Sequence, residues 1–317
     1  MHVSVSLPPA DIAALERFAD SVSDPKDPNF RQFITPEEVG ARFGLPAERV
    51  QAVADWLKSQ GLNVTLVAKN RMAILCEGTV SQFEAAFGTT IDQYVVDPVL
   101  APAVEGGNKE FIAPSTQLKA PASIAGDILD VFGLDTYVKP QPRMALTPTQ
   151  TRGLYNSAPA FSAGYTGVGR VCAISNFDGF RLTNVPLYYS YYTLPTPAGG
   201  VNSNVHTVVV GTGAGTGTAQ GEGDLDIQMV LGMAPLCEFY IYDSTSDLVG
   251  VLTREVNDNL ADVISESYGW NITATTANSA HNQHLSMSAQ GITYMCASGD
   301  SGTTSGSFAY QIGRAHV

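Results

Sequence analysis

The chain has 317 residues, of which 44% are hydrophobic and 15% are charged, and its formal net charge is −13. This length favours two domains, and the apolar content suffices for packed cores, which excludes an intrinsically disordered protein. The acidic balance excludes a nucleic-acid partner, because such proteins cluster Lys and Arg on one surface. Between Arg181 and Arg314 the only Lys or Arg is Arg254, so the second half has no basic face.

The first segment alternates short strands and helices. Hydrophobic periodicity and turn residues predict strands at 2–7, 62–68, 71–77 and 90–96, and helices at 11–22, 35–44, 46–61 and 79–88. Thr35 and Glu38 have the spacing of a helix capping box, Thr79 is a second N-cap, and Gly61 and Gly88 end their helices. Two strand–helix–strand sets joined by a hairpin predict a ferredoxin-like α+β sandwich.

A Pro-, Ala- and Gly-rich segment follows this unit, with one predicted helical patch at 122–134. Residues 138–147, VKPQPRMALT, form an extended, proline-stiffened linker in this interpretation. We therefore expect a first domain at 1–137, a linker at 138–147 and the beginning of a second domain at 148–311.

The pattern changes after the linker to apolar runs that alternate with helical stretches. The predicted strands are 169–177, 205–211, 237–243, 261–269 and 291–300, and the predicted helices are 224–233 and 248–260. Buried strands alternating with helices predict an α/β domain with a parallel sheet. Ligands of such sheets bind beyond the carboxyl ends of the strands, so polar residues at those ends are the candidates for a site.

Four cysteines are far apart in the sequence and form no CxxC pair. Cys172, Cys237 and Cys296 lie in apolar runs, where buried free thiols are expected rather than disulfides or metal ligands. No apolar run reaches the length of a membrane span, so no membrane partner is expected. The first residues show no basic and apolar signal-peptide pattern.

Three acids precede an apolar helical run in the segment GEGDLDIQ. Glu222 and Asp226 have i, i+4 spacing, which places them on one helix face within reach of each other, and Asp224 lies between them. The ordinary alternative is that acids in a first helical turn complement the helix dipole. Spacing alone does not decide between a functional carboxyl pair and this structural role.

A second candidate lies at the end of the last predicted strand, in ASGDSG. Asp300 is either a turn residue or a buried neutral acid that donates a hydrogen bond to a developing oxyanion. The GDSG string also matches the nucleophile motif of chymotrypsin-like proteases. We reject that role for Ser301, because those enzymes are antiparallel barrels with a histidine base, and neither feature is indicated here.

The whole chain resembles the sedolisin family of serine-carboxyl peptidases, as a pro-kumamolisin-type precursor. The segments that carry the resemblance are, in order, LPPADIAALERF, SDPKDPNFRQFITPEEVGARFG, VADWLKSQGLNVT, GTVSQFEAAFGTTI, APASIAGDILDVFGLD, LTPTQTRGLYN, AGYTGVGRVCAI, GEGDLDIQMVLGMAP, VISESYG and ASGDSG. The resemblance implies a subtilisin-like second domain, incomplete in this chain.

The resemblance also implies residue roles. Glu222 matches the family's general base, Asp226 the acid that orients it, and Asp300 the oxyanion-hole aspartate. Ser267, Tyr268 and Gly269 match the strand that binds the substrate backbone. A histidine base with a pKa of about 6.5 would be protonated at pH 4, whereas one member of a coupled carboxyl pair can still accept a proton.

The family's nucleophile is a serine in a Gly-Thr-Ser turn, followed by a calcium site, and the chain contains no Gly-Thr-Ser. We therefore expect the fragment to be inactive, without residues for the calcium of full-length members and without any other metal site. Residues 312–317, IGRAHV, match the translation of a common sequencing adapter, so we interpret them as an artefact of a truncated read.

The resulting hypothesis is a fragment of an acid-acting, secreted endopeptidase zymogen. Its partners would be protein or peptide substrates, with the propeptide bound to its own catalytic domain. An alternative from another class is a non-catalytic secreted binding protein on a degenerate peptidase scaffold. The absent serine fits that alternative, whereas the intact set of Glu222, Asp226 and Asp300 does not.

Overall fold

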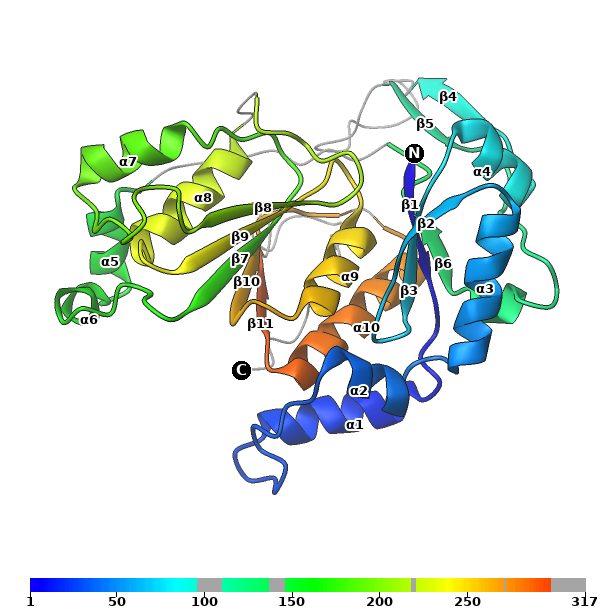
Figure 1. Ribbon diagram of the computed structural model, residues 1–317, viewed down its shortest axis with the longest axis horizontal. Helices are drawn as coiled ribbons and strands as arrows, with labels where there is room; N and C mark the ends of the chain where they lie inside the picture. Colours follow the sequence, from blue (N-terminus) through cyan, green and yellow to red (C-terminus); the bar gives the residue numbers. More distant parts are fainter. Residues whose placement is uncertain (96–109, 137–145, 218–220, 271, 298–317) are drawn as a thin grey trace, which may run out of the picture.

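The computed structural model describes residues 1–95, 110–136, 146–217, 221–270 and 272–297. Two units lie side by side, each built on its own sheet (Figure 1). The first unit holds a four-stranded antiparallel sheet and the second a five-stranded parallel sheet. Two helices of the second unit lie between the sheets, as described below.

The first unit orders its main sheet β2-β3-β1-β6. Its elements are β1 (His2–Ser6), α1 (Ile12–Ser23), α2 (Pro36–Arg42), α3 (Ala47–Ser59), β2 (Asn63–Val67), β3 (Ala73–Glu77), α4 (Val80–Phe87), β4 (Ile91–Val95), β5 (Glu110–Pro114), a 3₁₀ turn η1 (Ala125–Asp127) and β6 (Asp130–Phe132). Alternate side chains of β1 and β3 pack against α3 and α4, with Phe83 and Phe87 fully buried among them.

The helix caps expected from the sequence are confirmed. Thr35 and Glu38 form a reciprocal capping box on α2, and Thr79 forms one with Gln82 on α4. Gly88 ends α4 in the left-handed conformation, with φ of 59°. These caps satisfy backbone N–H groups that a helix start otherwise leaves without partners.

Two predictions for the first unit are wrong. The strand predicted at 90–96 exists as β4, but it pairs with β5 in a separate two-stranded sheet and not with the main sheet. The fourth position of the main sheet is taken by β6, from the segment predicted to be a helical patch. Residues 128–132, ILDVF, have no apolar–polar alternation that would indicate a strand, and pairing with β1 decides the outcome.

The second unit contains the parallel sheet predicted from the sequence, with the order β11-β10-β7-β9-β8. Its elements are α5 (Pro148–Leu154), α6 (Ala158–Ser162), β7 (Val171–Asn176), α7 (Asn184–Tyr192), β8 (Val205–Val209), α8 (Glu222–Met233), β9 (Glu238–Asp243), α9 (Leu248–Asp258), β10 (Val263–Glu266), α10 (Ala274–Gln290) and β11 (Thr293–Cys296). Because all strands are parallel, their carboxyl ends meet along one edge, where the polar candidates lie.

Helices cover both faces of the parallel sheet. One face packs on α7 and α8 through Ile174, Phe239 and Ile241, and the other packs on α9 and α10 through Ala173 and Ile264. The outer sides of α9 and α10 are in turn covered by the first unit, whose β3 contributes Leu75 to the same apolar cluster. The two helices therefore lie between two sheets (Figure 1).

Buried polar contacts join the two units. The hydroxyl of Ser4 on β1 donates to both carboxylate oxygens of Asp247, the N-cap of α9, at 2.8 and 2.6 Å. Asn70, in the β2–β3 turn, donates to Gln283 Oε1 at 2.7 Å and to Ser286 Oγ at 3.3 Å. Buried hydrogen bonds of this kind fix the orientation of one unit on the other.

Helix α10 is the longest helix described and was not predicted. Most polar side chains are expected outside a core, but here Ser279, Asn282, Gln283, Ser286 and Gln290 are all buried. A helix with partners on both sides has no apolar stripe, so hydrophobic periodicity does not identify it.

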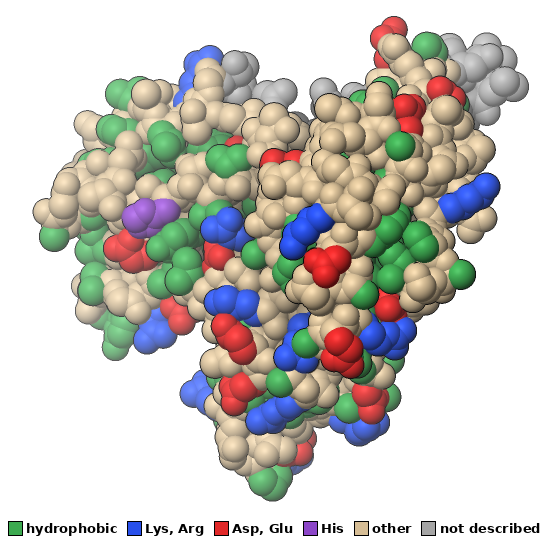
Figure 2. All heavy atoms as spheres, turned by 45° about the vertical axis from the view of Figure 1, so that its right-hand side comes forward, with side chains coloured by type: hydrophobic (Ala, Val, Ile, Leu, Met, Phe, Trp, Pro, Cys, Tyr) green, Lys and Arg blue, Asp and Glu red, His purple; other side chains and the backbone are tan. Residues whose placement is uncertain are grey.

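The surface repeats the uneven charge of the sequence. Figure 2 shows side chains of both charges gathered over the lower part of one face, around α1 and α2, and few over the upper left. All four cysteines have free thiols, with Cys76 and Cys237 buried and the other two half-buried. Within the described ranges, no helix has the length and apolar content that a membrane span requires.

Candidate active site

The first turn of α8 is fixed against the end of β7. Asp178, two residues beyond β7, accepts the backbone N–H of Glu222 at 3.0 Å and so caps the helix start. Gly223 lies so close to this segment that a Cβ there would be 2.8 Å from Asn176 Oδ1. The close approach places the predicted acids of α8 at the carboxyl edge of the sheet.

The three acids of this segment have different surroundings. Asp224 accepts the Arg181 backbone N–H at 3.1 Å and the Asn184 side-chain amide at 3.0 Å. Its carboxylate therefore holds the segment that leads into α7. Glu222 and Asp226 lie one helical turn apart on α8, as their spacing predicts.

Asp226, a residue of α8, has a buried carboxyl group that lies beside the end of strand β10. The hydroxyl of Ser267, directly after β10, donates to Asp226 Oδ1 at 2.7 Å. The other oxygen, Oδ2, is buried without a hydrogen-bond partner among the described residues. Burial raises the pKa of Asp226 to about 6, with a further increase from the charge of Glu266 and an opposing decrease from the Ser267 hydrogen bond.

Tyr268 joins the same site through its side chain. Its hydroxyl donates to Asn176 Oδ1 at 3.1 Å, and Asn176 donates to Asp243 Oδ1 at 2.8 Å. Burial raises the pKa of Tyr268 well above its usual value, and the charges of Asp226, Asp178 and Glu222 raise it further. The phenol therefore lies within the electrostatic field of all three carboxyl groups.

The structure thus brings together Asp226, Ser267 and Tyr268, with Glu222 one turn before Asp226. Gly269 follows as an exposed residue. Asp300 and Ser301 lie outside the described residues, so their positions relative to α8 are not part of this geometry. A buried carboxyl whose pKa is raised, beside a second carboxyl, can hold or exchange a proton in the acid range.

Sequence reasoning missed two members of this arrangement, Asn176 and Asp178. Both occupy the carboxyl end of β7, the central strand of the sheet. Their position at a strand end in SNFD is the signal that would have identified them, because parallel sheets place functional polar groups there.

Comparison with known proteins shows what this chain is similar to. Residues 1–137 match the Pro-kumamolisin activation domain. Xanthomonalisin of Xanthomonas sp. (strain T-22) is 28% identical over 95% of this chain and 39% of its own length. Sedolisin of Pseudomonas sp. (strain 101) is 26% identical over 95% of this chain and 54% of its own length.

The chain is similar to the pro-kumamolisin-type precursors of the sedolisin family. It spans about half the length of these curated relatives or less. A tripeptidyl-peptidase of Arthroderma otae is also similar, at 27% identity over 47% of this chain and 27% of its own length. The similarities to xanthomonalisin and sedolisin extend over 95% of the chain, beyond the residues that match the activation domain.

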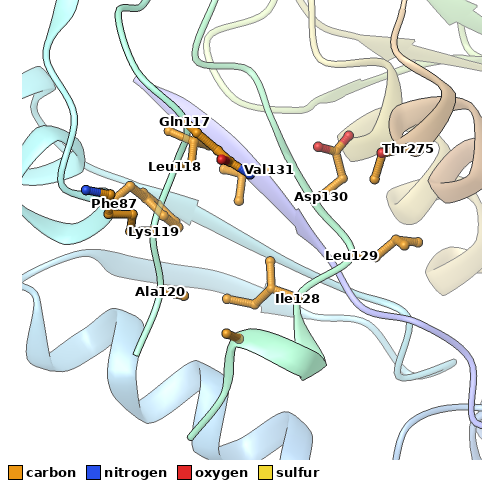
Figure 3. Close-up of a pocket in the computed structure, with 11 residues that line it drawn as sticks. Phe87, Gln117, Leu118, Lys119, Ala120, Ile128, Leu129, Asp130, Val131 and Thr275 are labelled. Carbon is orange, nitrogen blue, oxygen red and sulfur yellow. The ribbon is translucent and has the colours of Figure 1, made fainter. Parts of the chain in front are cut away.

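A pocket in the described structure lies away from these acids. It has a volume of about 390 Å³ and is formed by the first unit together with Thr275 of α10 (Figure 3). Its charged residues are Lys119 and Asp130, and none of the acid-site residues lines it. Asp130 Oδ2 accepts the hydroxyl of Thr276 at 2.5 Å, so this edge of the pocket belongs to the contact between the units.

Metal ligands are not gathered anywhere in the described part of the chain. No group of three or more His, Cys, Asp or Glu side chains with a metal-binding arrangement occurs among these residues. The calcium expected from the resemblance is therefore not assigned to residues of this chain.

Proposed function

We propose that the chain is part of the zymogen of an acid-acting serine-carboxyl endopeptidase, in which Glu222 is the general base and Asp226 orients it. The observation that carries this proposal is the buried Asp226 carboxyl, held by Ser267 and lying one turn from Glu222 at the carboxyl edge of the parallel sheet. Acid-range chemistry needs such a pair, because an ordinary imidazole is already protonated at pH 4.

The proposed division of roles follows from the surroundings of each group. Asp226, buried and with a raised pKa, keeps a proton to higher pH than a solvated carboxyl and can share it with Glu222. Glu222 would then accept the proton of a serine nucleophile. From the family resemblance, Asp300 would donate to the oxyanion, and residues 267–269 would pair with the main chain of a peptide substrate.

Finer features of the fold belong to the same proposal. The order β2-β3-β1-β6, with all neighbours antiparallel, supports a ferredoxin-like activation domain. The order β11-β10-β7-β9-β8, with all neighbours parallel, supports a subtilisin-like peptidase domain. We assign the linker to residues 138–147, of which only Leu146 and Thr147 are described.

The activation domain would bind its own peptidase domain and keep it inactive until acid conditions lead to cleavage of the linker. The contacts of Ser4 with Asp247 and of Asn70 with α10 support this arrangement. A secreted location follows from the family resemblance. The 317 residues contain no Gly-Thr-Ser serine, so we expect them to hydrolyse no peptide by themselves.

The test begins by sequencing the genomic locus beyond codon 311 and expressing the protein that it encodes. With a Gly-Thr-Ser serine present, the protein should cleave its linker at pH 4, and Glu222→Gln should reduce the rate by at least about 100-fold. Asp224→Asn is the matched control, because that carboxylate binds Arg181 and Asn184 rather than the site.

Processing by Glu222→Gln at the wild-type rate would remove Glu222 from the mechanism. A natural stop codon at this position, in a protein that folds and is produced, would instead support the non-catalytic binding protein. Thermal unfolding of both variants shows whether a lost rate reflects chemistry or misfolding.

A further inference from the structure

Glu266 is a second buried carboxyl, on the opposite face of β10 from the candidate site. It is the last residue of β10 and is 4% exposed. The indole N–H of Trp270 donates to Glu266 Oε1 at 2.5 Å, and the hydroxyl of Tyr294 donates to Glu266 Oε2. Both oxygens are therefore held in place.

The chain of hydrogen bonds continues to a third buried acid. Tyr294 Oη and Ser175 Oγ are 2.9 Å apart, and Ser175 donates to Glu255 Oε1 at 2.8 Å. Ser175 lies directly opposite Glu266 on β7, and Glu255 comes from α9. Two carboxyl groups thus face each other across two hydroxyl groups, between the parallel sheet and α9.

Counting hydrogens shows that this chain needs a proton from one of its acids. Three oxygen–oxygen hydrogen bonds link Glu255, Ser175, Tyr294 and Glu266, but the two hydroxyl groups supply only two hydrogens. The third bond is complete only when Glu255 or Glu266 is a neutral carboxylic acid. Two charged carboxylates here would leave one contact repulsive and both charges buried.

Glu266 is also adjacent to the candidate site. The residue after it, Ser267, donates to Asp226 Oδ1 at 2.7 Å, and successive side chains of an extended chain point to opposite faces. The backbone at the end of β10 therefore lies between the buried carboxyl groups of Glu266 and Asp226. A negative charge on Glu266 acts on Asp226 through this low-dielectric region, with little screening by solvent.

We propose that Glu266 is a positioning residue of the candidate site, and that its hydrogen-bonded chain to Glu255 stores a proton that determines how readily Asp226 becomes charged. This inference deepens the proposed function, on which it rests for the catalytic meaning of Asp226. The electrostatic link itself is a property of the folded chain and does not depend on peptidase activity.

The titratable and charged groups around the two carboxyls come from every neighbouring element. The charge of Glu266 acts on Asp226, and the charges of Asp226 and Glu222 act on Tyr268. Glu266 accepts from Tyr294 on β11 and its charge acts on Glu255 on α9, while the ring of His284 on α10 packs against Tyr294 at a tilt of 48°. Burial raises the pKa of Glu266 to about 7 and that of Glu255 well above its usual value. In acid the chain is therefore complete and Glu266 neutral, whereas above neutral pH its charge opposes ionisation of Asp226.

The test uses the full chain with ¹³C-labelled aspartate carboxyl groups, with the Asp226 resonance assigned by comparison with Asp226→Asn. In the wild type, coupling to Glu266 should spread the Asp226 titration over two phases. In Glu266→Gln the titration should become a single phase, with a midpoint lower by about half a pH unit or more. Glutamine at position 266 keeps an oxygen that accepts from Trp270 and adds an amide that can donate to Tyr294. The control is Glu238→Gln, because the Glu238 side chain is exposed on β9.

An unchanged Asp226 titration in folded Glu266→Gln would overturn the proposal. Should that variant fail to fold, Tyr294→Phe removes one donor from Glu266 and should move the upper phase of the Asp226 titration to higher pH. A titration identical to the wild type in folded Tyr294→Phe would also overturn it. Linker cleavage by the complete protein is measured separately, so loss of the proposed function and loss of this coupling are distinguishable.

Discussion

At the scale of single residues, three acids within five positions have three different surroundings. The i, i+4 spacing of Glu222 and Asp226 was enough to predict that they share a helix face. The separate role of Asp224 was not predictable, because its partners Arg181 and Asn184 come from a segment about forty positions earlier. Spacing along one helix gives local geometry, whereas partners from elsewhere depend on the tertiary fold.

The same limit applies to Ser267 and Tyr268. Resemblance placed both in a main-chain substrate strand, but the structure also gives their hydroxyl groups contacts, with Asp226 and with Asn176. Nothing in the local sequence VISESYG indicates that Ser267 contacts an acid on α8 or that Tyr268 contacts an amide on β7. This part of the site follows from the order of strands β7 and β10 in the sheet.

A residue-scale prediction concerns two helical glycines. A Cβ at Gly40 in α2 would lie 2.3 Å from the carbonyl oxygen of Lys69, so Gly40→Ala should destabilise the chain by about 1–3 kcal/mol as the backbones move apart. Gly153 in α5 has no atom within 4 Å of such a Cβ. Gly153→Ala should therefore be neutral or stabilising by up to about 1 kcal/mol.

Urea unfolding at one pH measures both glycine variants. Equal stability of the two would show that α2 and the 69–70 turn are not in close contact in solution.

At the scale of elements, capped and periodic segments were predictable and edge pairings were not. The boxes at Thr35 and Thr79 contain their own partners within four residues, so the sequence alone reveals them. Strand β6 is three residues long and exists because it pairs with β1, more than a hundred positions earlier. Helix α10 was not predicted, because it packs against the parallel sheet on one side and the first unit on the other and so has no single apolar stripe.

An element-scale prediction tests the cap of α4. Thr79→Ala removes the side-chain acceptor for the Gln82 N–H, and should lower the free energy of unfolding by about 1 kcal/mol. Ser81→Ala, at an exposed position of the same helix, is the matched control and should change stability by less than about 0.5 kcal/mol. Chemical denaturation followed by circular dichroism distinguishes the two; a Thr79→Ala chain as stable as Ser81→Ala would contradict the cap.

At the scale of the whole molecule, buried ionisable groups make stability depend on pH. The pKa of Glu266 is raised to about 7 and that of Asp226 to about 6, so both contribute stability in acid that is lost as pH rises through these values. For Glu266 the difference from its ordinary value corresponds to on the order of 3 kcal/mol. His2, whose pKa is raised despite burial through its contacts with Asp247 and Glu77, acts in the same direction.

One buried group acts in the opposite direction. Burial lowers the pKa of His284 to about 3, so its contribution is present above its ordinary value of 6.5 and is lost as pH falls below it. Because Glu255, Glu266 and Asp226 all favour acid, their sum outweighs this single histidine between about pH 5 and 8.

The expected result is a chain that is more stable at pH 5 than at pH 8, by a few kcal/mol. Urea unfolding at a series of pH values measures this difference, and Glu266→Gln should make the curve flatter in this range. A wild-type chain that is more stable at pH 8 would show that these carboxyls are solvated in solution.

Helices α9 and α10 are mostly buried, since a sheet lies on each side. The sheet of the first unit is also the part of the polypeptide that a ribosome completes earlier, since its last strand, β6, ends at Phe132, whereas α9 begins at Leu248 and α10 at Ala274. The first unit, with Ser4, Asn70 and Leu75 in place, can therefore fold before these helices are synthesised and bind them afterwards. Supplying residues 1–137 as a separate polypeptide during refolding of the second unit should consequently speed its folding.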